Sequence, residues 1–242
     1  MQHLFIPAEQ FSGESARICG ADHLHLARVL RARPGDSLLL LDNLGNAFQA
    51  ALVSLDKTET LARIEKIVTL PPEPPVFLTV AQALGKGDKF EQVIQHGTEA
   101  GASRFVPLQA ERCIVAIPAD KVAERVARWQ QIAKGAAEQS HRLRIPDVTL
   151  LQKFADWAQG ETESVPAMLL DPGPDAVPLA SVLKSLPAFP ARLTLAVGPE
   201  GGWSANELTQ AASLLRVSLG PRVLRTETAA LVAISQILYH FQ

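Results

Sequence analysis

Cysteine is scarce in this chain of 242 residues, which holds only Cys19 and Cys113. Because neither has histidine or cysteine neighbours at metal-ligand spacing, we expect two reduced structural thiols and no metal site. The chain also lacks an apolar run of the roughly 20 residues that a helix needs to cross a bilayer. Its start, residues 1–7, lacks the charged region and the long apolar region of an export signal. We therefore expect a cytoplasmic protein without a membrane segment.

The chain has no large excess of charge of one sign. It contains 23 lysines and arginines and 25 aspartates and glutamates, which gives a net charge of −2. This balance argues against non-specific binding of polyanions, although it is compatible with a local basic face. Apolar residues, in contrast, make up 47% of the chain, which is ample for a buried core. The length suits one large or two small domains.

A proline-rich stretch at residues 71–75 predicts a semi-rigid linker, because proline fits neither a helix interior nor a central strand. We expect a first domain over residues 1–70 and a second over residues 76–242. The first domain is expected to be β-rich, with a helix over residues 22–33 followed by strands over 37–43, 47–55 and 60–68.

The second domain alternates short apolar runs with helical patterns, which predicts an α/β fold with a mostly parallel sheet and helices on both faces. The expected strands cover residues 76–83, 104–110, 165–170, 193–197 and 217–219. The expected helices cover residues 89–100, 119–139, 179–186, 204–215 and 226–241.

A glycine-rich loop, Gly198-Pro-Glu-Gly-Gly202, follows the fourth of these strands. Just after it, Ser204 and Glu207 have the spacing of a capping box, and Trp203 and Leu208 stand where a hydrophobic staple would form. These patterns fix the start of the next helix and therefore the end of the loop. Because glycine has no side chain, the backbone of this loop can approach a flat or extended ligand closely. The alternative is that the glycines only satisfy the steric demands of a tight turn.

A second loop again leads from a strand into a helix, by way of Gly220 and Pro221. Because ligands of open α/β sheets bind at the carboxyl ends of strands, we expect the two loops to converge on one site. Polar side chains crowd the start of the following helix, and helix capping with surface charge is the alternative explanation for them. They are Arg222, Arg225, Thr226 and Glu227. Neither loop has a Walker motif, so we do not expect a triphosphate.

Two other features allow more than one interpretation. The segment Gly85-Lys-Gly-Asp-Lys-Phe90 resembles a dinucleotide fingerprint, but Phe90 stands where the third glycine is needed, so we reject that interpretation. Basic residues gather on the helix over 119–139 and its exit, and again at Arg28, Arg31 and Arg33. A solvated surface is the alternative to a nucleic-acid-binding face in both places.

The two glycine loops, residues 198–202 and Leu219-Gly-Pro-Arg-Val-Leu-Arg-Thr-Glu-Thr-Ala229, together resemble the paired motifs of the knotted SPOUT methyltransferases. The match is to the 16S ribosomal RNA uridine N3-methyltransferase family. It covers nearly the whole chain, through residues 82–89, 98–101, 111–112, 128–129, 138–142 and 23–36. That family usually has an arginine-rich start, where this chain has Gln2-His-Leu-Phe5.

The resemblance implies a PUA-like β-barrel that binds RNA, followed by an α/β methyltransferase domain with a trefoil knot. It also implies a cytoplasmic homodimer that uses S-adenosylmethionine to methylate uracil N3 in 16S ribosomal RNA, within the small subunit. The implied cofactor contacts are Leu170, Gly198, Pro199, Gly201, Leu219, Gly220, Leu224 and Thr226. At Gly201 we expect a close approach of the backbone or a positive φ. The expected RNA contacts are Arg28, Arg31, Arg33, Lys86, Arg112 and Arg142.

Methyl transfer to uracil N3 is an in-line displacement, so positioning is expected to supply most of the catalysis. Arg225 is the candidate that stabilises the developing uracil oxyanion, and Glu200 is the candidate that orients the base or accepts its proton. Two alternatives stay open. One is a methyltransferase of the same fold that modifies another RNA position or a ribose 2′-hydroxyl, and the other is a non-catalytic RNA-binding assembly factor. We expect the apolar helix over 226–241 to form the dimer interface.

Overall fold

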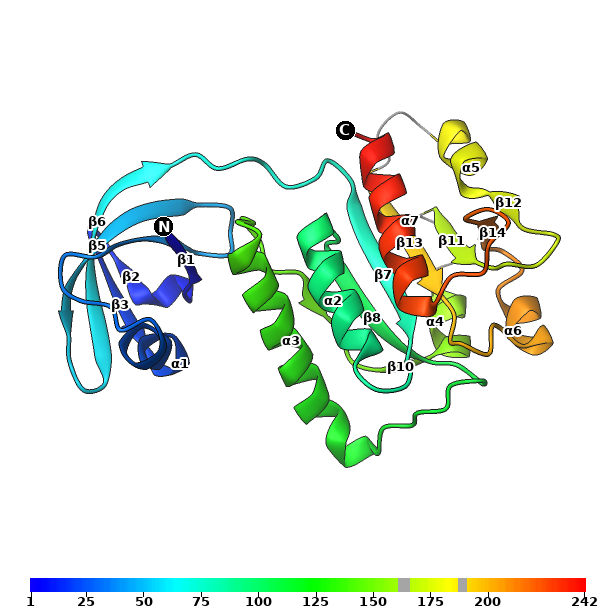
Figure 1. Ribbon diagram of the computed structural model, residues 1–242, viewed down its shortest axis with the longest axis horizontal. Coiled ribbons are helices and arrows are strands. Elements are labelled where there is room, and N and C mark those ends of the chain that lie inside the picture. Colours follow the sequence, from blue (N-terminus) through cyan, green and yellow to red (C-terminus); the bar gives the residue numbers. More distant parts are fainter. Residues whose placement is uncertain (161–165, 187–190) are drawn as a thin grey trace. The chain divides into compact units, whose positions relative to one another are not determined.

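The computed structural model describes residues 1–160, 166–186 and 191–242, and it divides into two compact units (Figure 1). Unit 1 comprises residues 1–73 and 137–145, and unit 2 comprises residues 74–136 and 146–242. The chain passes from unit 1 to unit 2 inside the proline-rich stretch. Residues 137–145 differ from the expected division, because they lie in the second half of the chain and yet belong to unit 1.

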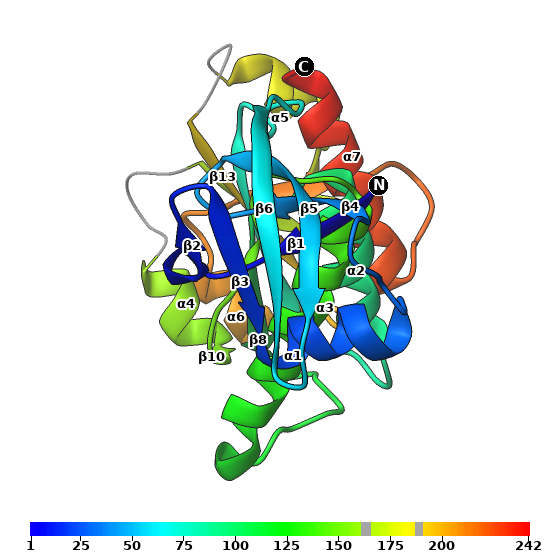
Figure 2. The same cartoon turned by 90° about the vertical axis from the view of Figure 1, so that its left-hand side faces the viewer.

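Unit 1 is built on a six-stranded sheet with the order β1-β4-β5-β6-β3-β2 (Figure 2). Its β1 pairs in parallel with β4, and the other pairings are antiparallel. The strands are β1 Gln2–Phe5, β2 Phe11–Ser12, β3 Ser15–Cys19, β4 Ser37–Leu41, β5 Ala47–Leu55 and β6 Glu59–Val68. Short helical segments add η1 Ala8–Gln10, α1 Gly20–Leu24 and the π-helical η2 His25–Val29. The helical segment is shorter than predicted, and Arg31, just beyond it, has a φ of +51°.

Residues 137–145 complete a second, small core of unit 1. Ala137 is buried with Phe5, Leu41 and Ala47, and three further apolar side chains pack against them: Leu70, Leu143 and Ile145. Glu73 binds the same segment, since its Oε1 accepts hydrogen bonds from the backbone nitrogens of residues 143 and 144 at 2.9 and 3.1 Å. Side-chain packing and hydrogen bonds therefore both join this segment to unit 1.

Unit 2 contains the predicted parallel sheet, in the order β10-β8-β7-β13-β11-β14-β12 with β9 beside β8. Every strand pairing given for its described residues is parallel. The strands are β7 Phe77–Ala83, β8 Arg104–Gln109, β9 Asp147–Val148, β10 Gln152–Lys153, β11 Ala167–Leu170, β12 Val177–Pro178, β13 Arg192–Val197 and β14 Leu215–Ser218. The predicted α/β class is confirmed. Of the predicted strand over 165–170, Val165 lies outside the described residues.

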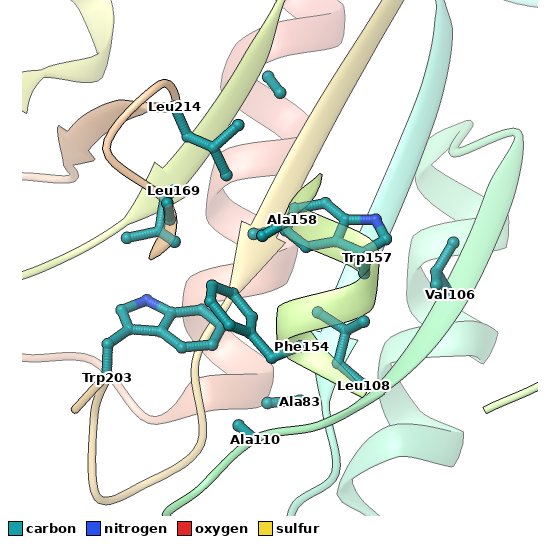
Figure 3. Packing of buried hydrophobic residues seen from close by; sticks show 14 residues of the cluster. Ala83, Val106, Leu108, Ala110, Phe154, Trp157, Ala158, Leu169, Trp203 and Leu214 are labelled. Atoms are coloured by element: carbon teal, nitrogen blue, oxygen red, sulfur yellow. The ribbon is translucent and has the colours of Figure 1, made fainter. Parts of the chain in front are cut away.

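The helices of unit 2 cover both faces of this sheet. They are α2 Lys89–Ala100, α3 Val122–Gln139, α4 Phe154–Gly160, α5 Leu179–Ser185, α6 Ala205–Gln210 and α7 Thr226–His240, with η3 Ala119–Lys121 ahead of α3. The last residues of α3, from Ala137 onward, belong to unit 1. On one face, Phe154, Trp157 and Trp203 form a buried cluster with small residues that include Ala83 and Ala110 (Figure 3). On the other face α7 contacts α2, β7 and β13.

The expectation that α7 forms a dimer interface assumed that its apolar side chains are exposed on the single chain, and this assumption is wrong. Ala230, Ala233, Ile234 and Ile237 are fully buried within their own chain. A Cβ added to Gly97 on α2 would lie 3.2 Å from Ile234 Cδ1, which shows how closely the two helices approach. The stripe therefore stabilises the single chain, and the homodimer stays a prediction of the resemblance.

Candidate functional site

The two glycine loops converge on one cavity of about 550 Å³ at the carboxyl ends of β13 and β14. This edge is where open α/β sheets bind ligands, and the volume lies within the usual range for small-molecule sites. The eight residues expected to contact a cofactor and the two expected to act in catalysis all line it: Leu170, Gly198, Pro199, Glu200, Gly201, Leu219, Gly220, Leu224, Arg225 and Thr226.

The predicted capping box fixes the end of the first loop. Glu207 donates from its backbone nitrogen to Ser204 Oγ at 3.0 Å, and Ser204 donates from its backbone nitrogen to Glu207 Oε2 at 2.8 Å. Trp203 donates from Nε1 to the carbonyl oxygen of Leu170 at 2.9 Å, and Leu208 packs against the cluster that contains Trp203. Trp203 thereby joins the loop to the neighbouring strand β11.

The glycines of this loop are needed for different reasons. A Cβ on Gly198 would lie 3.1 Å from the Trp203 ring, and a Cβ on Gly201 would lie 3.1 Å from Arg112 Cβ. Close approach is therefore the requirement at Gly201. The positive φ is found instead at Gly202, at +67°, and in the second loop at Gly220, at +111°.

One hydroxyl group connects the two loops. Thr226 donates from Oγ1 to the carbonyl oxygen of Gly198 at 2.6 Å, and the same Oγ1 accepts a hydrogen bond from Gln82 Nε2 at 2.8 Å. Both Gln82 and Thr226 are buried. The start of α7 is therefore fixed against the first loop by the side chains of Gln82 in β7 and Thr226 in α7.

Two carboxylates face the cavity. Asp171 accepts a hydrogen bond from Arg216 Nε at 2.8 Å and another from the backbone of Gly173 at 3.0 Å. Glu200 is 2.7 Å from Lys89 Nζ, and the backbone nitrogen of Lys86 donates to the same oxygen at 3.3 Å. Both carboxylates therefore line the cavity while they accept hydrogen bonds from neighbouring groups of the chain.

Glu200 is held in its ionised form. Burial raises the pKa of its carboxyl, but the hydrogen bonds from Lys89 and the backbone, together with the Lys89 charge, outweigh burial and leave the pKa below its usual value. Lys89 also lies 3.5 Å from Glu227 Oε2, and its own pKa is raised, first by the hydrogen bond to Glu200. Arg225, in contrast, is exposed at the start of α7 and makes no capping hydrogen bond.

The residues expected to contact RNA fall into two groups. Arg28, Arg31 and Arg33 in unit 1 are exposed, as is Lys86 in unit 2. Arg112 is exposed but donates from Nη1 to the carbonyl oxygen of Gly201 at 2.8 Å, so it supports the cavity loop.

Arg142 differs most from expectation. Its guanidinium is bound to Glu73 and its side chain is only 8% exposed. The carboxylate of Glu73 neutralises the charge of Arg142 within unit 1. The structure therefore does not support Arg142 as an RNA contact.

Among the described residues, no cluster of three or more histidine, cysteine, aspartate or glutamate side chains could hold a metal ion. Within those residues, no helix combines the length and the apolar character needed to span a membrane. Cys19 and Cys113 are both free thiols, as expected.

Comparison with known proteins decides the family. A family model described as an RNA methyltransferase domain matches residues 72–238, and a model described as an RNA methyltransferase PUA domain matches residues 18–65. The chain belongs to this RNA methyltransferase family. Its β-rich unit 1 thus contains the predicted PUA-like module, and most of the methyltransferase domain lies in unit 2.

Individual relatives agree with this family. The ribosomal RNA small subunit methyltransferase E of Bacillus subtilis is 34% identical, with 99% of this chain and 96% of that protein covered. The protein of the same name from Synechocystis sp. is 35% identical over 97% of this chain and 76% of its own. The crystal structure of the Neisseria gonorrhoeae enzyme bound to S-adenosyl methionine is 31% identical, with a TM-score of 0.88 over 99% of this chain and 97% of that one.

Several site residues of this RNA methyltransferase were missed from the sequence. Lys89 lies in the segment rejected as a dinucleotide fingerprint, and Gln82 and Asp171 stand at strand ends where only their position could mark them. The segment 82–89 did form part of the resemblance to the methyltransferase family, so the sequence indicated that this segment matters. No local pattern, however, reveals that Lys89 meets Glu200.

Proposed function

We propose that this chain transfers a methyl group from S-adenosylmethionine to N3 of a uridine in 16S ribosomal RNA. The observation that carries the proposal is the convergence of both glycine loops on one cavity at the carboxyl edge of the parallel sheet. The names of the relatives, which are small subunit ribosomal RNA methyltransferases, support the RNA substrate. The N3 position comes from the resemblance of the loops to the uridine N3-methyltransferase family.

The cavity suits this cofactor in shape and charge. Bare backbone at Gly198 and Gly201 and apolar side chains at Leu170, Val197 and Leu219 provide a surface for a flat adenine ring. S-adenosylmethionine carries a sulfonium cation and an amino group, and Asp171 and Glu200 supply two carboxylates in the cavity wall. We assign the loop backbone and Asp171 to cofactor binding.

When bound, the cofactor supplies an activated methyl group. The residues of the chain hold the uracil nitrogen in line with that group, which replaces a bimolecular encounter by a fixed geometry. As N3 loses its proton, negative charge develops on the uracil oxygens, and the exposed guanidinium of Arg225 donates to one of them. Glu200 is a weak base because its pKa is lowered, so we assign it to orienting the base, and the N3 proton passes to solvent.

RNA binding is assigned to exposed basic residues. A paired uracil hides N3, so the substrate base must be unpaired or flipped out. Arg28, Arg31 and Arg33 in unit 1, and Lys86 in unit 2, would bind phosphates of the RNA. A cytoplasmic location follows from a ribosomal substrate, and the homodimer and the trefoil knot stay predictions of the resemblance.

The test is mass mapping of the nucleoside that the purified protein modifies in 16S ribosomal RNA and in isolated small subunits. We expect one added methyl group on the base of a uridine, at N3. A methyl group on ribose or on another base would support the alternative methyltransferase. Absence of S-adenosylmethionine binding in calorimetry would instead favour a non-catalytic assembly factor.

A further inference from the structure

Gln82 lies behind the cavity, near the carboxyl end of β7. Its side chain is buried, with only 1% of the residue exposed, and its Nε2 donates to Thr226 Oγ1 at 2.8 Å and to the carbonyl oxygen of Ala83 at 3.0 Å. The Thr226 hydroxyl in turn donates a hydrogen bond to the carbonyl oxygen of Gly198 at 2.6 Å. Gly198 and Thr226 line the cavity, so Gln82 acts on its wall through the threonine hydroxyl.

The direction of these hydrogen bonds is fixed by their chemistry. An amide nitrogen is only a donor, so the Thr226 hydroxyl accepts from Gln82 and must give its own proton to Gly198. A reversed amide would place Gln82 Oε1 against the carbonyl oxygen of Ala83, where two acceptors would repel each other. The glutamine thereby selects the hydroxyl orientation that joins the two cavity loops.

Stability alone does not explain this arrangement, because the two hydrogen bonds from Nε2 leave the other end of the amide without a partner among the described residues. Gln82 Oε1 is buried and has no hydrogen-bond partner within the described part of the chain. A buried acceptor without a partner destabilises a protein, whereas an apolar side chain of the same volume would remove that cost. The site therefore keeps a polar group that a stability criterion alone would disfavour, which is typical of functional positions.

We propose that Gln82 is a positioning residue, which holds the 198–202 loop and the start of α7 together in the conformation that binds the methyl donor. The identity of the ligand rests on the function proposed above. The connection between the loops does not, because it is made by the chain itself.

The test compares Gln82→Met with a matched variant, Gln130→Met. Gln130 has both ends of its amide satisfied, by the Pro146 carbonyl oxygen and the Val148 backbone nitrogen, each at 2.9 Å. Gln82→Met should keep or raise the thermal midpoint while it weakens S-adenosylmethionine binding by about tenfold in calorimetry, the size of one lost hydrogen bond. Gln130→Met should lower the midpoint and leave the affinity unchanged.

Hydrogen exchange in the free protein gives a readout that needs no ligand. In Gln82→Met, the amides of Glu200 and Gly201 and those at the start of α7 should exchange faster than in the parent. The effect of Gln82→Met should also disappear in a Thr226→Val background, because the glutamine acts only through that hydroxyl. Unchanged exchange, or additive effects in the double variant, would overturn the positioning role. If the parent protein fails to bind S-adenosylmethionine, the proposed function falls, and the exchange comparison still decides whether Gln82 connects the loops.

Discussion

Lys89 Nζ lies 2.7 Å from Glu200 Oε1, so the first residue of α2 neutralises a carboxylate of the cavity wall. In Lys89→Met the hydrogen bond and the charge of Lys89, which lower the pKa of Glu200, are lost, while burial, which raises it, remains. We expect the carboxyl to take up a proton at a higher pH than in the parent. The rate of methylation should then fall at mildly acidic pH, where the parent still has an ionised Glu200.

Carbon-detected NMR of the Glu200 carboxyl and single-turnover methylation measured against pH would check this prediction. Lys121→Met is a suitable control, because it removes an exposed ion pair with Glu124 at 3.2 Å and leaves Glu200 untouched. An unchanged Glu200 titration in Lys89→Met would show that the lysine does not set its protonation.

Gly201→Val should weaken S-adenosylmethionine binding while the fold survives. The new side chain would begin 3.1 Å from Arg112 Cβ, which is fixed to its own backbone and cannot swing away. Overpacking of this kind typically costs about 1–3 kcal/mol, which corresponds to roughly a 5- to 150-fold loss of affinity if it falls on the bound conformation. Calorimetry with a circular dichroism check of the fold would measure it.

Gly135→Ala is the matched control for that substitution. A Cβ there meets nothing within 4 Å, and alanine favours the interior of α3, so stability should rise by about 0.5–1 kcal/mol with cofactor affinity unchanged. Equal affinity in Gly201→Val and Gly135→Ala would remove Gly201 from the cofactor site.

Stability should fall between about pH 6.5 and pH 4 through His3. This residue is 6% exposed and stacks on His141 with ring centroids 3.8 Å apart. Burial, followed by the charges of His141 and the N-terminus, lowers its pKa from 6.5 to about 4. The folded state therefore binds fewer protons than the unfolded state in this window, so stability is complete above pH 6.5 and decreases as the pH falls.

Urea unfolding at about pH 7.5 and pH 4.5 would measure the loss, for which we expect about 1–3 kcal/mol. His3→Gln removes the titrating group and should reduce the pH dependence. Identical pH dependence in the parent and His3→Gln would contradict the role of His3.

Replacement of Arg28, Arg31 and Arg33 by glutamine should weaken RNA binding without affecting the cofactor. If each arginine contacts one phosphate of a single strand, the slope of log affinity against log salt should fall by about 2. Affinities measured at several salt concentrations would show this, with Arg17→Gln as a control from the same unit, since Arg17 is 3.5 Å from Glu59. An unchanged slope would remove this cluster from the RNA site.

Much of unit 2 could be predicted because each element carries its own pattern. The helix expected over 89–100 is observed at those residues, and Ser204 and Glu207 form the expected capping box. Elements without a sufficient local pattern were missed. The strand β3 does alternate, with Ala16 and Ile18 buried, but it is only five residues long.

The candidate site was predictable where it depends on backbone and not where it depends on tertiary contacts. Glycine and proline mark the loops directly, because few other residues fit such turns. The partners Lys89 and Glu200, or Gln82 and Thr226, are far apart in the chain, and only the fold brings them together. Arg142 shows the opposite error, since its charge indicated RNA while its actual partner is Glu73.

The membership of residues 137–145 in unit 1 has a consequence for the order in which the chain folds during synthesis. Domains usually fold as units from the N-terminus while the ribosome is still adding residues. The core around Phe5 and Leu41 cannot close until Ala137, Leu143 and Ile145 have been made. The first part of unit 2, residues 74–136, separates these partners in the chain, so the last step of unit 1 must wait until helix α3 has left the ribosome.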